Sequence, residues 1–91
     1  MTEQTAPIPH DPNARLDYGW DWVRELSTGE TITNVTATGT NVTSEAAAVV
    51  GTQTVAWVSG GTPGRASVRF HITTSAGRQD DRTLQLWVRE R

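Results

Sequence analysis

Cysteine and lysine are both absent from this chain of 91 residues. Without cysteine there is no disulfide framework and no thiolate zinc site. Without lysine, all eight basic residues are arginines, which pair with carboxylates in a two-pronged geometry and stack on aromatic rings. GC-rich codon usage explains this bias more simply, so the arginines alone do not indicate a function.

A strong net charge and a long apolar run are also missing. The formal charge of −2 argues against a nucleic acid held by phosphate neutralisation. No apolar stretch approaches the ~20 residues that a membrane span needs. No basic segment followed by an apolar one marks a signal peptide. We therefore expect neither nucleic acid nor membrane as a partner.

Residues 1–15 contain three of the four prolines: Pro7, Pro9 and Pro12. Proline lacks the amide hydrogen that helices and sheet ladders use, so we expect this segment to be an extended arm. Two interpretations stay open. One is a floppy terminus, which is common, and the other is an arm that orders on a neighbouring subunit with Ile8 as its anchor. Residues 16–91 are expected to form one domain.

Period-two alternation of apolar and polar residues predicts most of the strands. In residues 16–22 the large apolar side chains share one face, and Asp17 and Asp21 lie on the other. The last two strands, residues 65–74 and 82–90, are expected to pair as a hairpin across a polar loop. Their inward positions are Val68, Phe70, Ile72, Leu84, Leu86 and Val88.

The middle of the chain is rich in threonine and less regular. Ile32 and Val35 are out of phase, and a bulge at Thr33 or Asn34 would bring both into the core. In residues 52–58 we assign Val55 and Trp57 to the interior. Six or seven short strands with turn signals about every 8 to 12 residues predict an all-β, immunoglobulin-like antiparallel β-sandwich.

No group of residues indicates catalysis, a metal or a cofactor. The two histidines, His10 and His71, have no further ligand near them in sequence, and both are expected to be ordinary surface residues. Asp17 and Asp21 would lie roughly 13 Å apart along a strand, beyond the usual spacing of a catalytic carboxylate pair. We therefore predict that the protein is not an enzyme and binds no cofactor.

Trp87 is the main candidate for a contact with a partner. It falls on the outward face of the last strand, and tryptophan is enriched at interaction hot spots. Arg69 and His71 lie on the outward face of the neighbouring strand, where we expect them within stacking reach. The alternative is that the arm or a loop covers Trp87. Tyr18, Trp20 and Trp22 are assigned to the core.

Three stretches carry a resemblance: residues 17–22 (DYGWDW), 55–64 (VAWVSGGTPG) and 72–82 (ITTSAGRQDDR). Together they resemble a family of small proteins of tailed bacteriophages and prophages, over about residues 16–91. The sequence departs from the family pattern at Ala66-Ser67 and at residues 46–48. The resemblance implies a virion structural protein encoded among head and tail genes, with an immunoglobulin-like fold and no catalytic residues.

The leading hypothesis is a non-enzymatic capsid decoration protein that docks on the major capsid protein of a virion assembled in the host cytoplasm. Repeated weak contacts on a symmetric shell would add through effective concentration, and copies of the chain are candidate partners too. A head–tail connector, tail or fibre component is the alternative within this class. The alternative outside it is a carbohydrate-binding module that stacks a host-surface glycan on Trp87, or on Tyr18 and Trp20.

Overall fold

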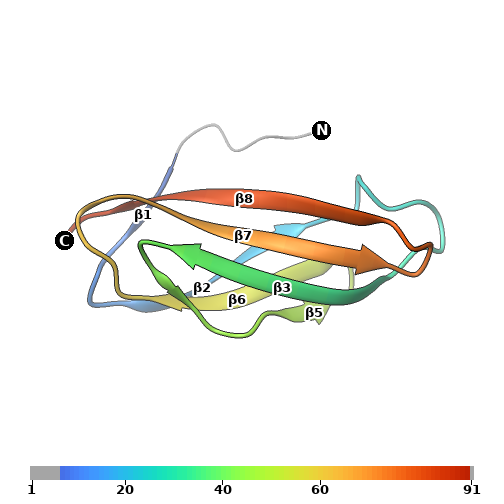
Figure 1. Ribbon diagram of the computed structural model, residues 1–91, viewed down its shortest axis with the longest axis horizontal. Helices are drawn as coiled ribbons and strands as arrows, with labels where there is room; N and C mark the ends of the chain where they lie inside the picture. Colours follow the sequence, from blue (N-terminus) through green and yellow to red (C-terminus); the bar gives the residue numbers. More distant parts are fainter. Residues whose placement is uncertain (1–6, 91) are drawn as a thin grey trace.

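The computed structural model describes residues 7–90, and that part of the chain is built from strands and turns without a helix (Figure 1). The strands are β1 (Ile8–His10), β2 (Arg15–Asp21), β3 (Ile32–Thr40), β4 (Thr43–Ser44), β5 (Ala48–Val50), β6 (Gln53–Ser59), β7 (Gly64–Thr74) and β8 (Gln79–Val88). No helix that could cross a membrane is found among residues 7–90. The predicted all-β sandwich is confirmed.

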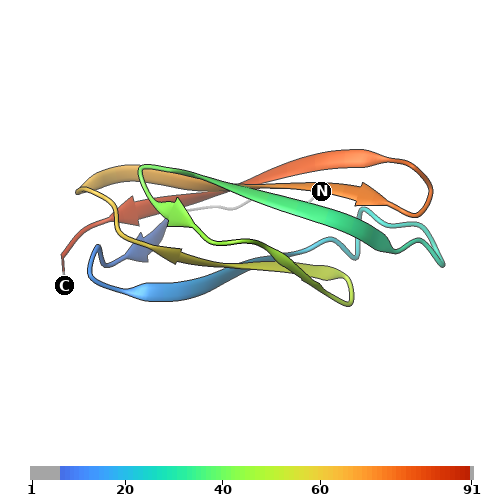
Figure 2. The same ribbon diagram turned by 60° about the horizontal axis from the view of Figure 1, so that its bottom comes forward.

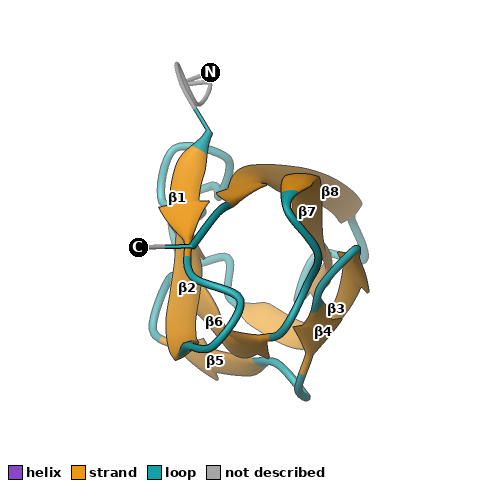
Figure 3. Cartoon of the chain, turned by 90° about the vertical axis from the view of Figure 1, so that its left-hand side faces the viewer, coloured by secondary structure: helices purple, strands orange, loops and turns teal. Residues whose placement is uncertain are grey.

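The strands form two facing sheets (Figures 2 and 3). Sheet A has the order β1-β8-β7-β3, and sheet B has the order β2-β6-β4 with β5 also paired to β6. The β7–β8 hairpin is present as predicted, with Gly77 in its turn at a φ of 80°. One pairing is not antiparallel, because β1 runs parallel to β8.

Strand β1 lies within residues 1–15, for which the prolines predict an extended arm outside any sheet. This prediction is wrong for Ile8–His10, which pairs with β8. No strand among residues 7–90 pairs with the outer side of β1, and Pro9 stands at its centre, level with Trp87 of β8. The amide of Arg89 donates to the carbonyl of His10 at 3.0 Å, so the ladder groups of His10 face β8. Those of Pro9 then face the open edge, where a missing amide hydrogen breaks no bond. Residues 1–6 of the expected arm lie outside the described residues.

The predicted bulge is confirmed near the start of β3. The register of β3 against β7 shifts between Ile32 and Asn34. The extra residue changes the phase of the strand, so Ile32 is buried and Val35 packs against the core. This irregularity lets two apolar residues three positions apart face the same interior.

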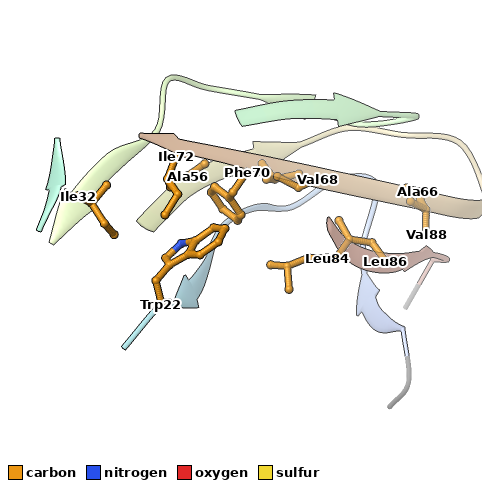
Figure 4. Close-up of a cluster of buried hydrophobic side chains, with 11 residues drawn as sticks. Trp22, Ile32, Ala56, Ala66, Val68, Phe70, Ile72, Leu84, Leu86 and Val88 are labelled. Carbon is orange, nitrogen blue, oxygen red and sulfur yellow. The ribbon is translucent and has the colours of Figure 1, made fainter. Parts of the chain in front are cut away.

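The core fills the space between the two sheets (Figure 4). All six inward positions predicted for β7 and β8 are buried, at 4% exposure or less. Trp22 is fully buried, and its indole Nε1 donates to the hydroxyl of Thr54 at 2.9 Å. This bond satisfies the polar atom that a buried tryptophan brings with it.

The phase assigned to β6 is wrong. Ala56 and Val58 are buried, whereas Val55 and Trp57 lie on the outward face, and Trp57 is 41% exposed. Residues 55–58 are all apolar, so alternation alone does not say which side of this strand is inward. The pairing with β2 decides it, because Tyr18 of the inward face lies opposite Ala56.

His10 is buried, so the expectation of a surface histidine at this position is also wrong. Its Nδ1 atom lies 2.7 Å from the hydroxyl oxygen of Tyr18, with the two rings edge to face. Because β1 belongs to sheet A and β2 to sheet B, this contact joins the two sheets at one edge. Figure 3 shows β1 and β2 on the same side of the sandwich, one above the other.

An ion pair fixes the segment between β2 and β3 to the β7–β8 hairpin. The guanidinium of Arg78 contacts both carboxylate oxygens of Glu30, at 2.6 and 3.0 Å, and it also donates to the carbonyl of Glu25 at 2.5 Å. The Thr74 hydroxyl and the Ser27 amide donate to Glu30 as well. These donors, Arg78 first, lower the pKa of Glu30 from 4.5 to about 2.

Candidate docking surfaces

Trp87 stands on the outward face of sheet A, as predicted, and it is 43% exposed. Its cross-strand neighbours are Pro9 of β1 on one side and Arg65 of β7 on the other. A shallow hollow lies beside the indole, lined by Pro7, Pro9, Trp87 and Arg89. We call Trp87, Pro9, Arg65 and Arg89 the Trp87 patch. Its rigid apolar surfaces flanked by cations are suited to docking on a protein.

Arg69 and His71 lie on the same outward face, away from the Trp87 patch. The residue paired with Trp87 is Arg65, so Arg69 is four positions further along β7, roughly 13 Å away. His71 is two positions beyond Arg69. The expected stacking of these two side chains on Trp87 is therefore not formed.

Both side chains contact Asp81 of β8 instead. Arg69 reaches its carboxylate at 3.1 Å, and the Nδ1 atom of His71 contacts the other oxygen. The Nε2 atom of His71 lies 3.1 Å from the side-chain oxygen of Gln79. The hydrogen bond with His71, followed by the charge of Arg69, lowers the pKa of Asp81. This part of the face is a polar network held within the chain.

Ile8, the expected anchor for a neighbouring subunit, contacts its own domain. It lies in β1 level with Leu86 and packs against the core. The described part of the arm thus uses its apolar side chain to cover the edge of its own sandwich. Whether Ile8 also meets a partner stays a prediction.

A second exposed tryptophan, Trp57, stands on the outward face of sheet B. The guanidinium carbon of Arg15 lies 4.4 Å from the centre of its ring. Glu45 holds this arginine through two hydrogen bonds, at 2.5 and 2.9 Å. The bonds lower the pKa of Glu45 and raise that of Arg15. Arg15 is therefore held over the indole of Trp57 and stabilises one orientation of that ring.

Other residues extend this surface along sheet B. Asp17 of β2 is the cross-strand neighbour of Trp57, and Gly19 is that of Val55. Ala48 and Val50 of β5 continue the apolar surface, and Val50 is 62% exposed. We call Trp57, Asp17, Arg15 and Glu45 the Trp57 patch. The sequence interpretation missed it because Trp57 was placed in the interior.

The fold and these surfaces define a small β-sandwich that presents a tryptophan on each of its two broad faces. Residues 10–87 match the model of a protein family described as podophage GP4 fiber-tail adaptor protein gp77, and the chain belongs to this family. It is therefore a structural component of a phage virion. A comparison with curated proteins finds no match.

Proposed function

We propose that this chain is a structural subunit of the joint between the tail and a fibre of a podophage virion. Membership of a fibre–tail adaptor family supports this position better than decoration of the capsid shell. The observation that carries the proposal is the exposed tryptophan on each broad face, Trp87 on sheet A and Trp57 on sheet B. An adaptor must contact two neighbours at once, and opposite faces allow that.

We propose further that the protein acts by binding alone. Two of its carboxylates are held in ion pairs with arginines: Glu30 pairs with Arg78, and Glu45 pairs with Arg15. A general acid or base works best with a pKa near the operating pH. The pKa of Glu30 is about 2, and that of Glu45 is lowered as well. These carboxylates suit permanent ion pairs better than proton transfer.

Cryo-electron microscopy of the virion tests the proposed position. We expect density for this sandwich where the fibres meet the tail. Phage lacking the gene should package DNA and lack attached fibres. Density on the capsid shell, or fibres attached normally without the gene product, would contradict the proposal and favour the decoration hypothesis.

Glycan binding is tested separately on the purified chain. A glycan array should show no ligand whose binding depends on Trp87, because a docking tryptophan contacts protein. If a sugar binds and Trp87→Ala abolishes that binding, the carbohydrate-binding alternative gains support. Trp57→Ala serves as the matched control, since this indole is exposed to a similar extent on the opposite face.

A further inference from the structure

The two tryptophan patches carry opposite net charges, because Arg15 and Glu45 of the Trp57 patch pair with each other and leave Asp17. Arg65 is the cross-strand neighbour of Trp87, and Asp17 is the cross-strand neighbour of Trp57. Both charged residues are exposed. Within residues 7–90 neither side chain is held by an ion pair or a hydrogen bond. Each patch therefore offers an unpaired charge that is opposite in sign to the unpaired charge of the other patch.

The same asymmetry extends over the two broad faces. The outward face of sheet A carries three arginines against one carboxylate, with Arg89 of the Trp87 patch counted: Arg65, Arg69, Arg89 and Asp81. The outward face of sheet B carries three carboxylates against one arginine: Asp17, Asp21, Glu45 and Arg15. One face is thus net positive and the other net negative, which is the arrangement that favours association of unlike faces.

We propose that the outward face of sheet A in one copy packs on the outward face of sheet B in the next copy, with Arg65 meeting Asp17. This inference names the partner of the two patches, and it rests on the proposed role of these patches as docking surfaces. Like faces are disfavoured, because sheet B against sheet B would oppose acids to acids. The contact is therefore between different surfaces of identical chains.

The positions of the patches agree with such a stack. Trp87 lies near the end of β8, and Asp17 lies near the start of β2. Figure 1 places these two strand ends at the same end of the sandwich. A copy stacked face to face, without sliding along its long axis, brings the patches together. The molecule measures 42 × 25 × 16 Å, so its broad face can supply the ~800 Å² per partner of a standard interface.

A contact between unlike surfaces leaves each copy able to bind two more. Such heterologous contacts generate a closed ring when the rotation between copies closes, and an open stack when it does not. In an open stack an inner copy has both broad faces covered by other copies, whereas each of the two terminal copies keeps one tryptophan face uncovered. Those two outer faces remain for the tail and the fibre proteins, as the adaptor role requires.

The test is sedimentation velocity on the full chain, from about 1 µM to about 1 mM and at low and high salt. We expect the wild type to self-associate, and more strongly at low salt. Arg65→Glu and Asp17→Arg should each weaken association by roughly tenfold or more. The double variant Arg65→Glu/Asp17→Arg should restore it, because the pair is present again with its signs exchanged.

A charge-matched control separates this contact from general repulsion. Thr28→Glu/Ala76→Glu lowers the net charge by two, as Arg65→Glu does, at exposed positions outside both broad faces. It should associate like the wild type. Circular dichroism shows whether each variant is folded. A wild type that stays monomeric, a control that dissociates as Arg65→Glu does, or a double variant that stays weak would each overturn the proposal.

The two proposals fail in different ways. Virions that carry separate, non-touching copies at the fibre joint would contradict the stack and leave the adaptor role intact. Purified chain that associates through Arg65 and Asp17, in a phage where it coats the capsid shell, would support the stack and contradict the adaptor role.

Discussion

The imidazole of His10 and the hydroxyl of Tyr18 meet at 2.7 Å and join the edge of sheet A to the edge of sheet B. His10→Ala should lower the free energy of unfolding by about 2–4 kcal/mol, because it removes a fully buried ring and leaves a cavity. Tyr18→Phe should cost about 1 kcal/mol through the lost hydrogen bond. Urea denaturation measures both values.

His71→Ala is the control for this prediction. His71 lies on the outward face, and Asp81 keeps its contact with Arg69 when the imidazole is removed. Its loss should cost less than about 1 kcal/mol. Equal effects at the two histidines would show that His10 does not hold the sheets together.

Gly39 in β3 is confined by the backbone that returns into β4. A Cβ atom at this position would stand 2.3 Å from the carbonyl oxygen of Val42, so the turn would have to move. Gly39→Ala should therefore cost more than about 2 kcal/mol. Gly29→Ala is the comparison: its φ is +80°, and no heavy atom lies within 4 Å of the added carbon. That variant should lose only about 1 kcal/mol from backbone strain. The order of the two melting temperatures tests this prediction.

Substitutions at three of the four tryptophans should divide into two groups by their effect on thermal stability. Trp22→Phe removes the partner of the buried Thr54 hydroxyl and should cost about 2–3 kcal/mol. Trp57→Ala and Trp87→Ala remove exposed rings and should each cost less than about 1 kcal/mol. Thermal unfolding followed by circular dichroism separates the groups. A large loss for Trp87→Ala would mean that its indole supports the fold.

Acid should remove the stabilisation that the Glu30–Arg78 pair gives. The pKa of Glu30 is about 2 in the folded chain, below its ordinary 4.5. A lowered carboxyl pKa stabilises the fold above about pH 4.5, and this stabilisation is lost as the pH falls towards 2. The advantage of the wild type over Glu30→Gln should thus be constant above pH 4.5 and shrink below it. Urea midpoints measured against pH give this difference, and a gap that stays constant down to pH 2 would contradict the assignment.

The sequence predicts best the strands with one apolar and one polar face. In β7 and β8 strict alternation identifies six buried residues and also identifies Trp87 as outward, although it omits Ala66 and Thr74, which β7 buries as well. In β6 both faces are apolar around Trp57, so only the pairing with β2 decides its orientation. The Trp57 patch therefore could not be predicted from local pattern.

Contacts between distant segments account for the remaining differences. Because proline lacks the amide hydrogen that a sheet ladder uses, its presence in residues 7–12 argues against a strand there. On the outer side of an edge strand that hydrogen would have no partner, so proline is tolerated in β1. The burial of His10 depends on Tyr18 in the other sheet. The separation of Arg69 from Trp87 depends on the register of β7 against β8. None of these is encoded in the neighbouring residues alone.

The parallel pairing of β1 with β8 makes the resistance of the domain to a pulling force depend on the direction of the force. Ile8 lies level with Leu86 and His10 lies level with Val88. A pull that draws residue 8 and residue 88 apart along the strands loads the β1–β8 and β7–β8 ladders in shear, so their hydrogen bonds are strained together. A pull across the strands would open the same bonds one after another. The sandwich should therefore resist tension between β1 and β8 best when the force runs parallel to these two strands.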